Sequence, residues 1–153
     1  HLSDDISREW TLSPDGSALA YSVAVTGAEP RVIAMRLDLA TGAAVPALDA
    51  AGSQINPAWS SDGELTVASV KPEGGGDAII ASVSGARDTL DANDDSIDLP
   101  LAWSPDGETL AVRAIDGATP YEARGSRIEL LRRDGTREAV SEGPDVLIVG
   151  WTE

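Results

Sequence analysis

The residues whose types and spacing most resemble a metal-binding site lie in the acidic stretch DANDDSID, which begins at Asp91. The side chains of Asp91, Asn93 and Asp95 have the alternate spacing by which oxygen ligands converge on Ca²⁺. An EF-hand loop then requires Gly at its sixth position and Glu at its twelfth, where this chain has Ser96 and Ala102. We therefore expect an acidic solvated loop here, with Ca²⁺ binding as the alternative.

A second candidate is a group of arginines in the C-terminal third of an otherwise acidic chain. Such a group could bind a partner that carries carboxylates. Because acidic residues lie close to these arginines in the sequence, we expect ion pairs on one sheet, with partner binding as the alternative. The arginines are Arg124, Arg127, Arg132, Arg133 and Arg137, and the acidic residues are Glu122, Glu129, Asp134 and Glu138.

The inventory of residues argues against catalysis. A Ser-His-Asp triad needs a histidine, and the only one is His1, at the start of the sequence. The chain has no cysteine, no Gly-x-Ser-x-Gly and no Gly-x-x-x-x-Gly-Lys, so the motifs of common hydrolases and phosphate-binding loops are missing. Zinc sites favour His and Cys. We expect a protein that is not an enzyme, with no catalytic residue, no cofactor and no assigned metal ligand.

Composition narrows the range of partners. The 153 residues include 26 acidic and 11 basic side chains, which gives a formal net charge of −15. A surface of this sign repels nucleic acid and acidic membranes. No apolar run approaches the ~18 residues that a membrane-spanning helix needs. Because the chain begins with His1 and not with Met, we expect a processed or excised piece of a longer protein.

A repeated phrase indicates which elements position these residues. The phrase occurs three times, each time after an apolar run and before a run in which apolar and small or polar residues alternate. The three copies are Ser13-Pro-Asp-Gly16, Ser60-Ser-Asp-Gly63 and Ser104-Pro-Asp-Gly107. Pro presets φ, Asp can bond its own backbone and Gly adopts the left-handed conformation, so each phrase predicts a tight hairpin. Its aspartates are 47 and 44 residues apart, a period typical of propeller blades.

Each repeat has room for four antiparallel strands, because period-two alternation recurs between its turns. The predicted fold is all-β: three four-stranded blades at 5–50, 54–91 and 98–143, and the start of a fourth at 145–153. The strands that we expect are 8–13, 18–25, 32–39 and 44–49; then 56–60, 64–70, 78–84 and 87–90; then 99–104, 109–115, 127–132 and 137–140; and 146–151 as an extra inner strand.

The phrase Pro-x-Trp-Ser-Pro-Asp-Gly-x-x-Leu-Ala resembles the repeat of TolB-like, WD40-like (PD40) β-propellers, most closely at 57–67 and 101–112. The first repeat departs from it, with Leu12 where the pattern has Trp and with Trp10 two positions earlier. The resemblance covers nearly the whole chain. It implies a propeller whose four tryptophans pack between blades, and it is a weaker guide to function because the phrase is a structural hairpin.

Propellers of this family include envelope and periplasmic binding proteins and the propeller domains of prolyl-oligopeptidase-type serine peptidases. We therefore expect a non-catalytic module that binds a protein or peptide partner in the cell envelope or outside the cell. One alternative is the substrate-gating propeller of such a peptidase, without its catalytic domain. Another is a sensor of a small ligand or Ca²⁺.

We predict that the 153-residue chain self-associates in isolation. Closed propellers have about four to eight blades, so three blades leave two apolar sheet faces and one strand edge without a neighbour. We expect the chain to be part of a propeller of about six to eight blades. Sedimentation at several concentrations measures the association, and a strictly monomeric species at high micromolar concentration would contradict the prediction.

Overall fold

A computed structural model of the chain describes residues 6–49, 52–71, 76–81, 87–91, 96–117, 124–142 and 151. Within these residues every regular element is a strand, and no helix is long and apolar enough to cross a membrane. The predicted all-β fold is confirmed. The strands are β1 (Ile6–Leu12), β2 (Ala18–Val25), β3 (Arg31–Asp38), β4 (Ala44–Pro46), β5 (Ser53–Trp59), β6 (Leu65–Val70), β7 (Gly76–Ala81), β8 (Arg87–Asp91), β9 (Ile97–Trp103), β10 (Thr109–Asp116), β11 (Gly125–Arg132) and β12 (Arg137–Glu142).

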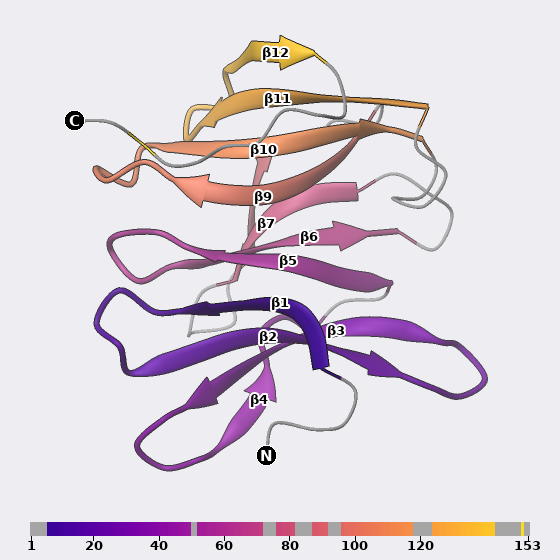
Figure 1. Ribbon diagram of the computed structural model, residues 1–153, viewed down its shortest axis with the longest axis vertical. Helices are drawn as coiled ribbons and strands as arrows, with labels where there is room; N and C mark the ends of the chain where they lie inside the picture. The colour runs from indigo at the N-terminus through magenta and orange to yellow at the C-terminus, as the bar shows by residue number, and fades with distance from the viewer. Residues whose placement is uncertain are drawn as a thin grey trace.

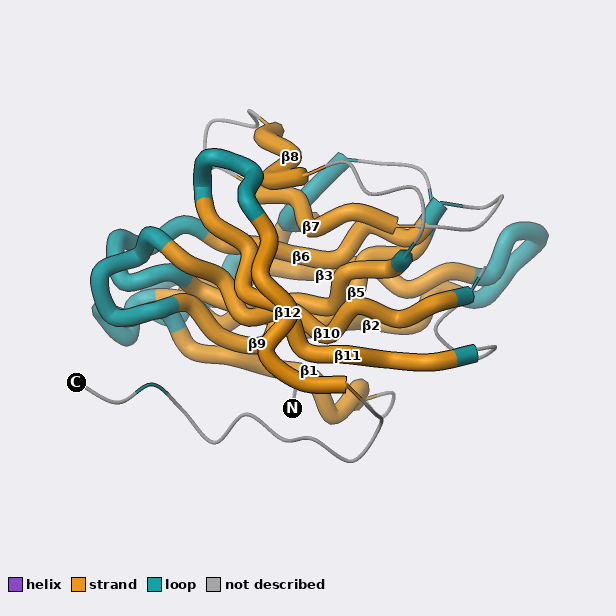
Figure 2. Tube along the Cα trace, turned by 90° about the horizontal axis from the view of Figure 1, so that it is seen from above, coloured by secondary structure: helices purple, strands orange, loops and turns teal. Residues whose placement is uncertain are grey.

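The strands form three stacked antiparallel units of four, β1–β4, β5–β8 and β9–β12 (Figure 1). In each unit the strands pair in chain order. The second and third units are joined into one continuous sheet by a single parallel pair, Gly76 with Ile97. Seen from above, the strands of the units overlie one another and the turns gather at the strand ends (Figure 2). The arrangement is that of successive propeller blades.

The first strand of each blade is irregular, and in the second and third blades the irregularity lies beside a proline. The register of β5 against β6 shifts between Ile55 and Ala58, where Asn56 has a φ of 52° and Pro57 follows. The register of β9 against β10 also shifts, next to Pro100. Proline lacks the N–H that a ladder needs, so it is tolerated at bulges.

The blades are held together by apolar clusters between their faces. Between the first two blades, Ala20, Ala34 and Leu48 pack against Leu65 and Val67. Between the second and third blades, the corresponding cluster is made of Ala58, Leu90, Trp103, Leu110, Val112 and Leu131. In both clusters alanines of one blade pack among larger side chains of the next, Ala20 and Ala34 in the first cluster and Ala58 in the second.

Two tryptophans occupy equivalent places in these interfaces, as predicted. The indole Nε1 of Trp59 donates a hydrogen bond to the Thr11 carbonyl oxygen of the first blade at 3.2 Å. The indole Nε1 of Trp103 donates to Thr66 Oγ1 of the second blade at 3.1 Å. Each tryptophan therefore extends back to the preceding blade.

The expectation for Trp10 was wrong. Its side chain is 64% exposed, and Leu12 and Leu39 on the first blade are 49% and 48% exposed. Trp10 pairs with Tyr21, whereas the adjacent residue of that strand, Ala20, packs against the second blade. Because successive side chains of a strand point to opposite faces, Trp10 lies on the face that points away from the second blade. Trp151 is partly buried, but the expected strand 146–151 otherwise lies outside the described residues.

Most strand boundaries lie within two or three residues of the prediction, and β4 departs from it for a clear reason. It ends at Pro46 instead of residue 49. Pro46 has no N–H to donate, and two residues later Leu48 turns inward and is only 5% exposed within the first interface. Burial of Leu48 between the blades outweighs continuation of the outer strand.

We predict that Leu131→Ala lowers the free energy of unfolding by about 2–5 kcal/mol. Leu131 is fully buried in the cluster between the second and third blades, so truncation leaves a cavity there. Val140→Ala, at a position that is 59% exposed, is the control and should change stability by less than about 0.5 kcal/mol. Urea unfolding measures both, and equal effects would show that this interface does not stabilise the fold.

Candidate functional site

The three hairpins between the first and second strands of the blades are built by the same hydrogen bonds. Ser13 Oγ donates to Asp15 Oδ1 at 2.7 Å, and Ser104 Oγ donates to Asp106 Oδ1 at 2.5 Å. Ser60 Oγ donates to Asp62 Oδ1 in the same way. Across the first turn, the Ala18 N–H donates back to Ser13 Oγ at 2.9 Å. Each serine hydroxyl thus ties the carboxylate to the returning strand.

Glycine completes each turn. Gly16, Gly63 and Gly107 have φ values of 70°, 86° and 74°, in the left-handed region that other residues disfavour. Figure 1 shows the three hairpins at the same end of the stacked sheets. The predicted turn is confirmed in all three repeats.

These hydrogen bonds keep the hairpin carboxylates ionised. Bonds from Ser13, and then from the Ser17 backbone and hydroxyl, lower the pKa of Asp15 from 3.8 to about 2. The serine hydroxyls of the other two hairpins, Ser60 and Ser104, are the largest cause of the lowered pKa values of Asp62 and Asp106. This end of the stack therefore carries a fixed row of negative charge.

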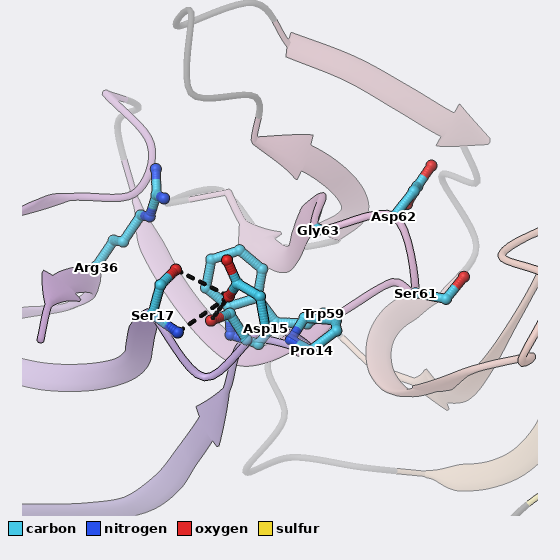
Figure 3. A pocket seen from close by; sticks show the side chains of 9 residues that line it. Pro14, Asp15, Ser17, Arg36, Trp59, Ser61, Asp62 and Gly63 are labelled. Atoms are coloured by element: carbon cyan, nitrogen blue, oxygen red, sulfur yellow. Dashed lines mark hydrogen bonds between the residues drawn. The ribbon is translucent and has the colours of Figure 1, made fainter.

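A pocket of about 150 Å³ lies between the first and second hairpins (Figure 3). Its walls combine an indole, one guanidinium, two carboxylates and serine hydroxyls. The Arg36 Cζ lies 5.7 Å from the ring centroid of Trp59. The lining residues are Ser13, Pro14, Asp15, Ser17, Arg36, Trp59, Ser61, Asp62 and Gly63.

The corresponding space between the second and third hairpins is narrower. A Cβ added to Gly107 would lie 3.1 Å from Ser61 Oγ, whereas a Cβ added to Gly63 would meet nothing within 4 Å. Arg133 also occupies this second space. Its Cζ lies 4.8 Å from the ring centroid of Trp103, and its Nε donates to the Gly107 carbonyl oxygen at 2.8 Å.

A second group of charges forms a chain across the third blade. Arg137 pairs with Asp98 and, at 2.5 Å between Nη1 and Oε2, with Glu129. Glu129 Oε1 in turn accepts from Arg127 Nε at 2.5 Å, and Arg127 Nη1 pairs with Asp116 Oδ1 at 2.5 Å. These groups neutralise one another within a partly buried sheet face, which is a structural role.

The carboxyls of this chain titrate in opposite directions. Burial raises the pKa of Asp98, which is fully buried, in spite of the hydrogen bond from Arg137. Burial also opposes ionisation of Glu129, but hydrogen bonds from Arg127 and Arg137 outweigh it and lower its pKa. Two guanidinium partners for Glu129 against one for Asp98 account for the difference.

The prediction of ion pairs among the arginines is confirmed in part. Arg127 and Arg137 pair with Glu129, and Arg132 lies 3.5 Å from Glu138. Arg133 instead joins two blades, because it reaches Asp62 and Glu64 of the second blade. Arg124 is exposed, and Glu122 lies outside the described residues.

The expectation for the acidic stretch was wrong at its end. Asp98 is no solvated loop residue, because it lies in β9 and its carboxylate pairs with Arg137. Asn93 and Asp95 lie outside the described residues, and Asp91 belongs to β8. Within the described part of the chain, no three His, Cys, Asp or Glu side chains gather as a metal site would require.

Reasoning from the sequence singled out the hairpins but missed the pocket. Arg36 and Trp59 lie on different blades, and only the stacking of the sheets brings them together. The available signal was the repeat itself, which places Trp59 at the end of a strand one residue before a hairpin.

Comparison with solved structures shows which architecture this is. A structure of putative TolB from Agrobacterium tumefaciens matches with a TM-score of 0.74 and 19% identity, over 93% of this chain and 53% of that one. TolB from Acinetobacter baumannii matches with a TM-score of 0.65 and 16% identity, over 93% of this chain and 35% of that one. A prolyl endopeptidase matches with a TM-score of 0.60 and 14% identity, over 89% of this chain and 22% of that one.

The chain has the fold of part of a TolB-like β-propeller. It spans about half the length of the Agrobacterium protein and about a third of the Acinetobacter protein. No protein-family model and no curated protein matches the sequence. At these identities the likeness concerns the fold.

We predict that Asp15→Asn flattens the acid side of the stability profile. The pKa of Asp15 is about 2 in the folded chain against an ordinary 3.8, so its charge stabilises the fold above pH 3.8. That contribution is lost as the pH falls from 3.8 toward 2. Thermal midpoints measured from pH 5 to pH 2 should therefore fall less steeply in the variant than in the original chain.

A second variant, Ser13→Ala, tests the same prediction in another way. It leaves the carboxylate in place but removes the hydrogen bond that lowers its pKa most. The slope should flatten in this variant too. Identical slopes in all three proteins would mean that the hairpin carboxylate does not couple to folding.

Proposed function

We propose that this propeller portion is a non-catalytic module that binds a protein or peptide partner at its hairpin end. The observation that supports this most directly is the row of three identically built hairpins at one end of the stack, with a pocket between two of them. Loops held on a rigid sheet scaffold are a common place for recognition.

The hairpins are preorganised for this role. The carboxylate of each is already oriented by its serine, so a partner need not order it on binding. The carboxylates keep their charge because their pKa values are lowered. Together with the net charge of −15, this favours a partner segment that is basic.

The same proposal places the module outside the cytoplasm. The support is the likeness to TolB structures and the resemblance of the repeated phrase to propellers of the envelope and periplasm. The described part of the chain contains no histidine and no cysteine, so it offers no Ser-His-Asp or Cys-His arrangement, which favours binding over catalysis.

A second candidate function is that of a gating propeller in a longer enzyme. The match to a prolyl endopeptidase, which covers only 22% of that chain, favours this reading. The sequence of the complete gene separates the two candidates. A Gly-x-Ser-x-Gly motif with Asp and His further along the chain would support the enzyme.

Selection from a random 12-residue peptide library on the immobilised chain tests binding. We expect enrichment of peptides rich in Arg and Lys, with affinities that fall as salt rises. In the double variant Asp15→Asn/Asp106→Asn, affinity should fall about tenfold, because two exposed charge pairs are lost. Glu29→Gln is the control, since the β2–β3 turn lies at the opposite end of the sheets (Figure 1).

Two results would contradict the proposal. One is the absence of any enriched peptide that binds the purified chain. The other is a set of peptides whose affinity falls with Glu29→Gln and is unchanged in the double variant, because binding would then use the other end of the blades.

A further inference from the structure

Arg133 shows how two successive hairpins hold a guanidinium. The group lies over the Trp103 ring and donates to the Gly107 carbonyl oxygen of its own blade. On the other side, its Nη2 lies 2.8 Å from Glu64 Oε2 and 3.4 Å from Asp62 Oδ2 of the preceding blade. An aromatic face, a carbonyl and carboxylates thus form a complete site for a planar cation.

The pocket between the first two hairpins repeats this site one blade earlier. Trp59 pairs with Leu65 across its hairpin as Trp103 pairs with Leu110, so the two tryptophans are equivalent. The equivalents of the other contacting residues follow from the turns. Gly63 corresponds to Gly107, Asp15 to Asp62, and Ser17 to Glu64. Gly63, Asp15 and Ser17 line the pocket together with Trp59.

The two aspartates also divide their oxygen atoms in the same way. Asp62 accepts from Ser60 through Oδ1 and faces Arg133 through Oδ2. Asp15 accepts from Ser13 Oγ, Ser17 N and Ser17 Oγ, at 2.7, 3.0 and 2.8 Å, and all three bonds end on Oδ1. Oδ2 of Asp15 therefore corresponds to Oδ2 of Asp62, the atom that faces Arg133.

The chain supplies no guanidinium at the matching position. Arg133 stands two residues after Leu131, which pairs with Leu110. In the second blade Ala81 pairs with Leu65, and two residues later the sequence has Val83, which lies outside the described residues. The position that corresponds to Arg133 therefore has no guanidinium in the sequence, and a guanidinium there, in addition to that of Arg36, would come from another molecule.

Arg36 leaves the pocket open and does not reverse its charge. Its Cζ is 5.7 Å from the Trp59 centroid, against 4.8 Å for Arg133 above Trp103, and about 150 Å³ remains. Against the Arg36 cation stands the carboxylate of Asp15, and the carboxylate of Asp62, which also lines the pocket, lies 3.4 Å from Arg133.

We propose that this pocket binds the guanidinium of an arginine side chain presented by a partner peptide, with Asp15 and Trp59 as its main contacts. The inference rests on the proposed function and names the chemistry of the ligand. Arginine is favoured over lysine because its planar group stacks on an indole while its N–H groups reach the carbonyl and the carboxylate together.

Titration of the chain with the pentapeptide Ac-Ala-Ala-Arg-Ala-Ala-NH₂, followed through the indole N–H signals in ¹H–¹⁵N spectra, tests the inference. The Trp59 signal, assigned with Trp59→Phe, should shift and saturate in the millimolar range, as expected for one side chain. The twin peptide with citrulline, which is neutral and nearly isosteric, should produce no saturable shift. The lysine twin should bind several-fold more weakly.

Three variants sharpen the test. Asp15→Asn should weaken the arginine peptide about tenfold, by loss of one charge-assisted contact. Ser17→Glu, which installs the residue that Glu64 provides for Arg133, should strengthen it several-fold. Asp106→Asn alters the same kind of turn away from this pocket and should leave the affinity unchanged.

Equal binding of the citrulline peptide, or an affinity that neither Asp15→Asn nor Ser17→Glu changes, would overturn the inference. So would the absence of any saturable shift of Trp59 with the arginine peptide. If library peptides still bind the hairpin end in that case, the proposed function stands and only this pocket is wrong. Because Ser17→Glu predicts a gain, a variant that merely unfolds cannot imitate the expected result.

Discussion

A hydrogen bond from a serine hydroxyl to the aspartate two residues later determines the geometry of every repeat. It closes the hairpin between the first two strands of each blade, and the same hydroxyl accepts an N–H from the returning strand. The residue just before the serine is thereby fixed at the end of the first strand. In the second and third repeats this residue is Trp59 or Trp103, which then contacts the preceding blade.

The first repeat has no tryptophan directly before its serine, so it shows what this tryptophan contributes in the other two repeats. Leu12 precedes its serine and is 49% exposed, and Trp10 is 64% exposed on the same face. No other blade among the described residues contacts these two side chains, whereas Trp59 and Trp103 each contact the preceding blade. The local hairpin is therefore independent of the neighbour, but burial of the strand-end side chain is not.

The difference between local hairpin formation and packing between blades explains how far the sequence could predict the structure. The hairpins, the strand order and the blade count depend on local turn chemistry and period-two alternation, and these were predicted. The contacts of Asp98, Arg133 and Arg36 depend on how one strand or blade lies over the next. No pattern in the sequence reports that arrangement, so the pairing of Asp98 with Arg137 and of Arg133 with the second hairpin emerged only from the structure.

The two oxygen atoms of the Asp62 carboxylate make separate contacts. One oxygen accepts the turn hydrogen bonds, and in Asp62 the other accepts a guanidinium from the next blade. Because the turn bonds already lower the pKa of Asp15 to about 2, the charge that a ligand would meet is fixed by folding and requires no further ordering. The pocket that we propose as a binding site is therefore the counterpart, one blade earlier, of a contact that joins two blades.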